Sequence, residues 1–217
     1  YVKFAGQTWR IVRINEDGTI RIVMQDGINS NADIQFNSNR NNYTYMYYTN
    51  SEAKTTLESW YQTNIGSKSN LAKNVASGNY YCEQAKAKYD DAYTSGNATM
   101  TTYSSYIPDF KCSSDRNNKG VVNASVGLLS YDEVVYAGGY LGQSNNSYYL
   151  YNNTYFWTMS PAGFSGSYAT VWRVPLEGYF TYNYVTNAYD ARPVLNLNAD
   201  TLATGSGTSS DPFVVSS

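Results

Sequence analysis

Three short apolar segments separated by polar loops make up most of the last quarter of the chain, and they constrain its fold more than any other feature. They read FWTMS at 156–160, ATVWRV at 169–174 and ARPVLNL at 191–197. Aromatic and β-branched residues suit the pleated, half-buried surface of a strand, so we expect a small sheet here. The loops are dense in Tyr, Asn, Ser and Gly, which recognition surfaces use for rigid contacts and adaptable hydrogen bonds. The segment predicts a sheet that presents a binding face, and not a catalytic centre.

The first 24 residues predict a tight β-meander. We expect strands at Tyr1–Phe4, Thr8–Ile14 and Thr19–Met24, joined by turns at 5–7 and 16–18. The second turn contains an Asp-Gly step, which is a strong hairpin signal. The middle strand, TWRIVRI, carries apolar residues on both faces, so we expect it to be central in its sheet.

Two helices are expected in the middle of the chain. Ser51–Thr63 follows a capping residue and has an apolar stripe at a spacing of three to four residues. Ser130–Gly138 begins with a capping box of Ser130 and Glu133 and ends at a glycine. Asp132 and Glu133 favour the helix dipole there, a structural role rather than a catalytic one. The remaining expectations are an exposed loop at 26–50, a short helix at 69–77, an irregular region at 78–119 and a last strand at 212–216.

The composition excludes several classes of function. Among 217 residues there is no histidine, so the usual general base and the commonest metal ligand are missing. We therefore expect no enzyme, no tightly held transition metal and no ordinary hydrolase triad. Charged residues are 15% and the net charge is −2, which excludes the basic face of a nucleic-acid-binding protein.

Membrane and targeting signals are not evident either. No apolar run approaches the roughly 20 residues that span a bilayer. No signal-like segment precedes the first strand, so we expect a targeting segment to be missing from this sequence. No internal repeat or domain boundary is evident, and we expect one domain over residues 1–217.

One segment offers oxygen ligands for a metal ion. Asp26 and Asp33, with Asn29 and Asn31 between them, carry the oxygen atoms that Ca²⁺ prefers. The spacing matches no strict calcium loop. We predict no cofactor, and the alternative is a structural calcium ion bound by this segment.

The two cysteines, Cys82 and Cys112, predict a disulfide. The polar, lysine-poor composition is typical of an extracellular protein, in which a lone cysteine pair usually forms a disulfide. The bond would close a loop of about 30 residues and contribute roughly 3–4 kcal/mol in the chain-entropy picture. Two free thiols in a cytosolic protein are the alternative.

An exposed aromatic surface is expected beside the C-terminal sheet. In SYATVWRV, Ala169 and Val171 alternate toward the core, which leaves Tyr168 and Trp172 on the other face. The loop at 175–187 holds few aliphatic residues and many rings, and a contiguous cluster of exposed rings usually marks an interaction site. The predicted binding residues are Tyr168, Trp172, Arg173, Tyr179, Tyr182, Tyr184 and Tyr189. The alternatives are a solvated or self-packed tyrosine-rich surface, with the loop at 41–50 as the binding face instead.

The order TWRIVRI, GTIRIVM, GLLSYDEVVYAGG, YFWTMSP, ARPVLNL and GSGTSSDPFVV resembles a family of C-type-lectin-like surface domains from gut Bacillota and mollicute-like bacteria. Its architecture is allied to retroelement-diversified variable proteins and to the formylglycine-generating enzyme. The resemblance implies an α+β fold with mixed antiparallel sheets, two main helices and long irregular loops. Two features of those relatives are missing here. The calcium-binding Glu-Pro-Asn and Trp-Asn-Asp runs of sugar-binding C-type lectins are absent. The formylglycine-generating enzyme has a reactive cysteine pair late in its chain, whereas both cysteines of this chain lie before the C-terminal segments.

These observations favour a non-enzymatic, extracellular recognition domain of a bacterial surface or pilus-tip protein. It would bind a protein or glycan of a host, a microbe or a phage by aromatic stacking and hydrogen bonding from a rigid scaffold. The alternative is a structural subunit of a surface filament, with the tyrosines as subunit contacts. No nucleic-acid partner is expected.

Overall fold

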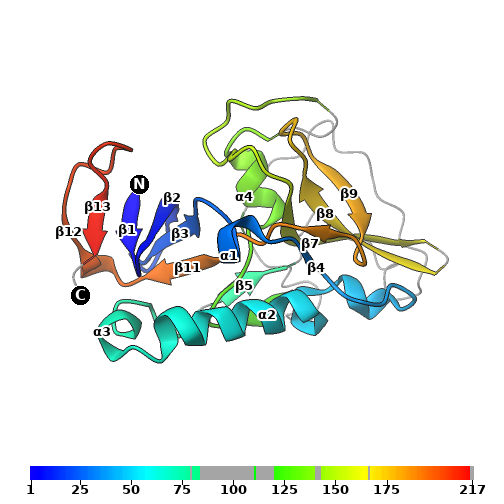
Figure 1. The fold of residues 1–217 in the computed structure, drawn as a ribbon, viewed down its shortest axis with the longest axis horizontal. Helices are drawn as coiled ribbons and strands as arrows, with labels where there is room; N and C mark the ends of the chain where they lie inside the picture. Colours follow the sequence, from blue (N-terminus) through cyan, green and yellow to red (C-terminus); the bar gives the residue numbers. More distant parts are fainter. Residues whose placement is uncertain (79, 84–109, 111–119, 140–142, 166, 216–217) are drawn as a thin grey trace.

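The protein has an α+β fold, as predicted, in which antiparallel sheets predominate and helices are few. This computed structural model describes residues 1–217 except 79, 84–109, 111–119, 140–142, 166 and 216–217. Within that part the strands form one six-stranded sheet, one three-stranded sheet and two strand pairs. The larger sheet and the three-stranded sheet lie toward opposite ends of the molecule (Figure 1).

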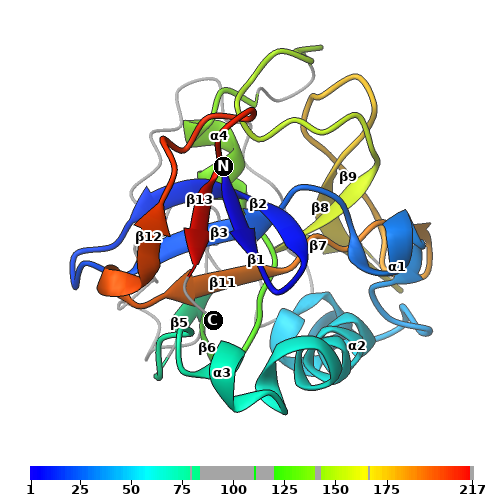
Figure 2. The same ribbon diagram turned by 60° about the vertical axis from the view of Figure 1, so that its left-hand side comes forward.

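The six-stranded sheet joins both ends of the chain. Its order is β11 (Val194–Leu197), β3 (Ile20–Met24), β2 (Gln7–Ile14), β1 (Val2–Phe4), β13 (Phe213–Val215) and β12 (Leu202–Thr204). Strands β1 to β3 confirm the predicted meander, and β2 is central as expected. The first turn is tight because Ala5 and Gly6 both have positive φ, 51° and 75°. Figure 2 shows β13 beside β1, which it pairs in parallel.

The C-terminal apolar segments are strands, but they do not share one sheet. β7 (Phe156–Ser165), β8 (Tyr168–Val174) and β9 (Thr181–Tyr184) form the three-stranded sheet, with β8 in the middle. β11, the predicted ARPVLNL strand, instead pairs with β3 of the larger sheet. The prediction of one small C-terminal sheet was wrong in this respect. The two strand pairs are β4 (Ile34–Gln35) with β10 (Ala188–Tyr189), and β5 (Tyr80–Cys82) with β6 (Val121–Asn123).

Both predicted main helices are present and begin at the predicted caps. In α2 (Glu52–Tyr61) the Ser51 hydroxyl accepts a hydrogen bond from the Lys54 amide, 3.0 Å. In α4 (Tyr131–Tyr136) the Ser130 and Glu133 side chains form the expected capping box. The shorter helical segments are α3 (Ser69–Ala72), the 3₁₀ turns Tyr43–Met46, Tyr48–Asn50 and Ala199–Thr201, and the π turn Gln62–Gly66. The segment labelled α1 (Ile28–Asn31) is a left-handed turn. No described helix is long and apolar enough to cross a bilayer.

Residues 26–50 are not the exposed loop that their polar composition predicted. Phe36, Met46 and Tyr48 are fully buried there, and Phe36 contacts Trp157 with ring centroids 5.7 Å apart. Isolated large side chains at wide spacing therefore anchor a polar segment to the core, a pattern that has no helical or strand period. Most of the predicted irregular region at 78–119 lies outside the described residues.

The buried apolar side chains form one continuous cluster. It includes three of the four tryptophans, Trp9, Trp157 and Trp172, each at most 1% exposed. The fourth, Trp60 on α2, is partly buried against Trp9, with ring centroids 6.4 Å apart.

Candidate functional site

The seven predicted binding residues differ widely in exposure. Tyr168, Tyr182 and Tyr184 are exposed, at 42%, 52% and 38%. Trp172 is only 1% exposed, and Arg173, Tyr179 and Tyr189 are partly buried. The expectation that all seven form one exposed surface was wrong.

The alternation of strand β8 divides these residues between the two faces of the sheet. Residues two apart on a strand share a face, and directly opposed residues on neighbouring strands share it too. Trp172 is opposed by Tyr182, and Thr170 by Tyr184. These residues therefore lie on the same face as Tyr168.

Arg173 belongs to the other face of the sheet. Its guanidinium carbon lies 4.6 Å from the centre of the Tyr189 ring and 5.4 Å from that of Tyr155. The Nε and Nη1 atoms are buried and have no hydrogen-bond partner among the described residues. Asn183 donates a hydrogen bond to the Tyr189 hydroxyl, 2.7 Å. These contacts make Arg173 and Tyr189 part of the packing behind the sheet rather than of an open surface.

Trp172 is a core residue because helix α4 covers its end of the sheet. Its ring centroid lies 5.1 Å from that of Tyr131 on α4 and 6.1 Å from that of Phe180. The alternation itself was predicted correctly. What it could not indicate was that a helix packs over one half of this face and leaves the other half open.

Arg40 lies on the open half of the face, and the sequence analysis did not predict it there. Its guanidinium carbon lies 4.3 Å from the centre of the Tyr168 ring and 4.5 Å from that of Tyr184. The two rings are 5.2 Å apart, and the Arg40 carbonyl accepts a hydrogen bond from the Ala169 amide, 2.8 Å. No described carboxylate pairs with Arg40. We call Arg40, Tyr168, Tyr182 and Tyr184 the tyrosine surface.

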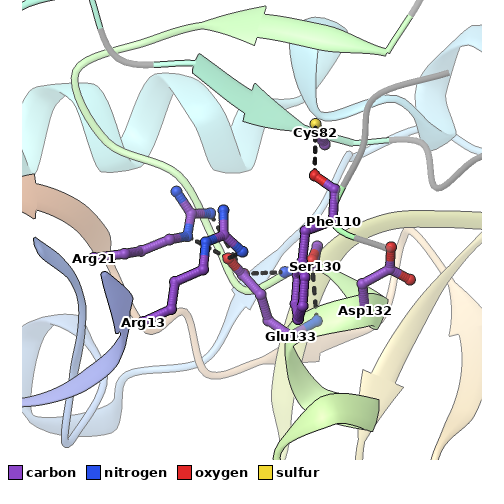
Figure 3. A pocket seen from close by; sticks show the side chains of 7 residues that line it. All are labelled: Arg13, Arg21, Cys82, Phe110, Ser130, Asp132 and Glu133. Atoms are coloured by element: carbon purple, nitrogen blue, oxygen red, sulfur yellow. Dashed lines mark hydrogen bonds and ion pairs between the residues drawn. The ribbon is translucent and has the colours of Figure 1, made fainter. Parts of the chain in front are cut away.

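A second cluster, buried and charged, lies beside α4. Figure 3 shows the guanidinium groups of Arg13 and Arg21 pointing toward the Glu133 carboxylate. Arg13 Nη1 lies 2.9 Å from Glu133 Oε1, and Arg21 Nε forms a second ion pair with the same oxygen. The other carboxylate oxygen accepts from the Ser130 amide, 2.9 Å. The capping glutamate therefore also forms ion pairs with two arginines of the large sheet, a role that the sequence analysis did not predict.

The ion-pair cluster has no room for a ligand. The cavity that it lines, together with Cys82, Phe110 and Asp132, has a volume of about 10 Å³. A space of that size holds at most one water molecule. Burial alone would raise the pKa of Glu133, but the charges of Arg21 and Arg13 outweigh it and hold the pKa below its ordinary value. The cluster thus stabilises the junction of α4 with the sheet.

The disulfide remains a prediction, and so does the absence of a cofactor, with a structural calcium ion as the open alternative. No group of three or more His, Cys, Asp or Glu side chains that could hold a metal ion occurs in the described part of the chain. Asp26, Asn29 and Asn31 do come together, around an open polar cavity. Cys82 ends strand β5, and Cys112 lies outside the described residues, so their pairing is not tested.

Comparisons with protein-family models, with curated proteins and with solved structures found no match to this chain.

Proposed function

We propose that this chain is a non-enzymatic, extracellular ligand-recognition domain that binds through the tyrosine surface. The observation that carries the proposal is the position of Arg40, whose guanidinium packs over the rings of Tyr168 and Tyr184. Tyrosine and arginine are enriched among the residues that contribute most to binding at interfaces. Tyrosine supplies a rigid, amphipathic contact area at a small loss of conformational entropy.

The scaffold beneath this surface supports the same function. Ala169 and Val171 are fully buried on the opposite face of β8, and Trp172 is packed under α4. Tyr168 is thus held by β8, which cannot move without disturbing the core, and Tyr182 and Tyr184 are held by β9, which pairs with β8. A C-type-lectin-like architecture, displayed on a bacterial surface or pilus tip, accounts for such an arrangement, with a protein or a glycan of a host, a microbe or a phage as ligand.

The test uses the labelled full chain on an array of surface proteins and glycans from hosts, microbes and phages. We expect at least one spot to bind, and we expect Arg40→Ala or Tyr182→Ser to weaken that binding by about 30-fold. Tyr136→Ser is the matched control, because Tyr136 is 69% exposed and lies on α4. Equal losses in the control and the test variants, or an array without any bound spot, would contradict the proposal.

The same variants also test the alternative function, a filament subunit. Sedimentation of the chain over a range of concentrations would show self-association if the tyrosines are subunit contacts. Self-association that Tyr182→Ser abolishes, combined with an array on which nothing binds, would favour the filament subunit over the recognition domain.

A further inference from the structure

An open polar cavity of about 340 Å³ lies between the large sheet and helix α2. It shares no residue with the tyrosine surface, so a ligand bound in it would be independent of the proposed function. Its lining residues are Gln7, Met24, Asp26, Gly27, Asn29, Ser30, Asn31, Trp60 and Asn64. The volume falls at the lower end of the range of about 300–1,000 Å³ that is typical of small-molecule sites.

The wall of the cavity is a strained left-handed turn. Asn29, Ser30 and Asn31 have φ angles of 52°, 61° and 64° in succession. Each such residue costs roughly 1–2 kcal/mol in a chain of L-amino acids, and this strain persists only where the surroundings fix the backbone. Here Ile28 is fully buried and its amide donates to the Ala191 carbonyl, 3.0 Å. The amide of Gly27 donates to the Asn31 side chain, 2.6 Å.

Two polar side chains of the turn, Asn29 and Ser30, have no hydrogen-bond partner among the described residues. Both residues are exposed. Asp26, also exposed, forms no hydrogen bond or ion pair with one. An amide presents two donors and two acceptor lone pairs, and a hydroxyl both donates and accepts. The wall therefore matches a ligand with several groups that both donate and accept hydrogen bonds.

The opposite wall is Trp60. One part of its ring packs on Trp9, and the remainder is open to the cavity. No described residue accepts a hydrogen bond from its indole nitrogen. A partly exposed indole offers a flat apolar face together with a donor, and the amides of the turn line the same cavity.

The charge of the cavity narrows the ligand class further. Asp26 is the single charged residue among those that line it, so an anionic ligand is repelled. One carboxylate and one ring do not form the aromatic cage that selects an organic cation. We propose that this cavity binds a neutral, polyhydroxylated ligand, the terminal unit of an uncharged saccharide, stacked on Trp60 and hydrogen-bonded by Asp26, Asn29 and Ser30.

The test titrates the full chain with a panel of uncharged oligosaccharides and follows acrylamide quenching of tryptophan fluorescence. The other three tryptophans are at most 1% exposed, so the quencher reports on Trp60. We expect at least one saccharide to protect the fluorescence from quenching. Sialylated and sulfated versions of the same saccharide should bind more weakly.

A pair of matched variants makes the test specific. Glycine accepts a positive φ without strain, so Asn29→Gly removes the amide and keeps the turn. It should weaken saccharide binding about tenfold. Asn153→Gly is the control, because Asn153 also has a positive φ, 60°, and lies outside the cavity. Absence of protection by any uncharged saccharide, equal loss in the two variants, or preference for the anionic saccharides would overturn the proposal.

Discussion

Gly27 lies directly against the carboxylate of Asp190. A Cβ atom at position 27 would fall 1.3 Å from Asp190 Oδ1, closer than any non-bonded contact allows. Asp190 is only 1% exposed, and its other oxygen accepts a hydrogen bond from the Thr154 hydroxyl, 3.4 Å. The absence of a side chain at this glycine lets the chain that leads into the strained turn pass directly against the buried Asp190.

Substitution of this glycine should destabilise the protein for a steric reason alone. Gly27 has a φ of −80°, which alanine adopts without strain. We expect Gly27→Ala to lower the free energy of unfolding by about 1–3 kcal/mol, the usual effect of overpacking a core. Urea denaturation of the variant and the parent measures the change. In the double variant with Asp190→Ala the loss should be smaller than the sum of the two single losses, and simple additivity would contradict the steric account.

Two buried carboxyl groups should make the protein more stable at mildly acidic pH than at neutral pH. Burial raises the pKa of Asp190 from 3.8 to about 6 and that of Glu83 from 4.5 to about 7. Between the ordinary pKa of each carboxyl group and its raised pKa in the folded protein, the folded state binds more protons than the unfolded state. The free energy of unfolding therefore falls as the pH rises through this interval. We expect a higher urea midpoint at pH 5 than at pH 7.

The chain contains no histidine that could mask this dependence. Asp190→Asn and Glu83→Gln should each reduce the change in midpoint between pH 5 and pH 7. A parent protein whose midpoint rises with pH over this interval would show that these two carboxyl groups are not the titrating ones.

Trp172 and Tyr182 are neighbours on one face of the sheet, yet their substitutions should differ sharply. Truncation of a buried tryptophan typically costs about 3–5 kcal/mol of stability, and Trp172 is 1% exposed. Tyr182 is 52% exposed, and Tyr182→Ser should change stability by less than about 1 kcal/mol. Thermal denaturation of Trp172→Ala and Tyr182→Ser tests this difference. Similar melting temperatures for the two variants would place Trp172 outside the core.

Removing the charge of Glu133 should be strongly destabilising. Glu133→Gln leaves Arg21, which is 2% exposed, without its carboxylate, and breaking a buried ion pair in this way costs about 3–5 kcal/mol. The exposed Glu16 is the matched control, and Glu16→Gln should change stability by less than about 0.5 kcal/mol. Because the folded-state pKa of Glu133 is lowered, its contribution is present above its ordinary pKa of 4.5 and is lost as the pH falls below that value. Chemical denaturation at pH 7 and pH 3 measures both effects.

The cysteine pair should form a disulfide between Cys82 and Cys112. Intact mass should rise by about two protons on reduction, and reduction should lower the stability by roughly 3 kcal/mol. Mass spectrometry with and without a reductant, followed by thermal denaturation, checks both. Two thiols that alkylate freely in the native, unreduced protein would end this prediction.

Local signals in the sequence located the strands of the meander and both main helices. The Asp-Gly step predicted the second hairpin of the meander, and the capping residues Ser51 and Ser130 predicted where α2 and α4 begin. These signals work because a turn or a cap depends on the hydrogen bonds of a few adjacent residues. The burial of Phe36 and Tyr48 could not be found in this way, since no periodicity marks two separate anchors in a polar segment.

The candidate site was predicted only in part, and for a related reason. Alternation correctly placed Tyr168 and Trp172 on one face of β8, but it carries no information about what covers that face. Arg40 was missed because it comes from a segment about 130 residues earlier in the chain. The polar cavity was missed because Trp60 and Asn29 meet across two elements that share no local pattern.

The sequence by itself determined the strands of the meander, the strands of the C-terminal apolar segments, the starts of α2 and α4 and the lack of histidine, all of which are local or compositional properties. Tertiary structure alone decided that ARPVLNL joins β3 rather than β7, that Tyr131 buries Trp172, and that Arg40 completes the tyrosine surface. The physical reason is that the backbone hydrogen bonds at a strand's edge and the side chains on its face can be paired or covered by any segment that the folded chain brings there. That choice depends on packing among segments distant in sequence, which a local pattern does not encode.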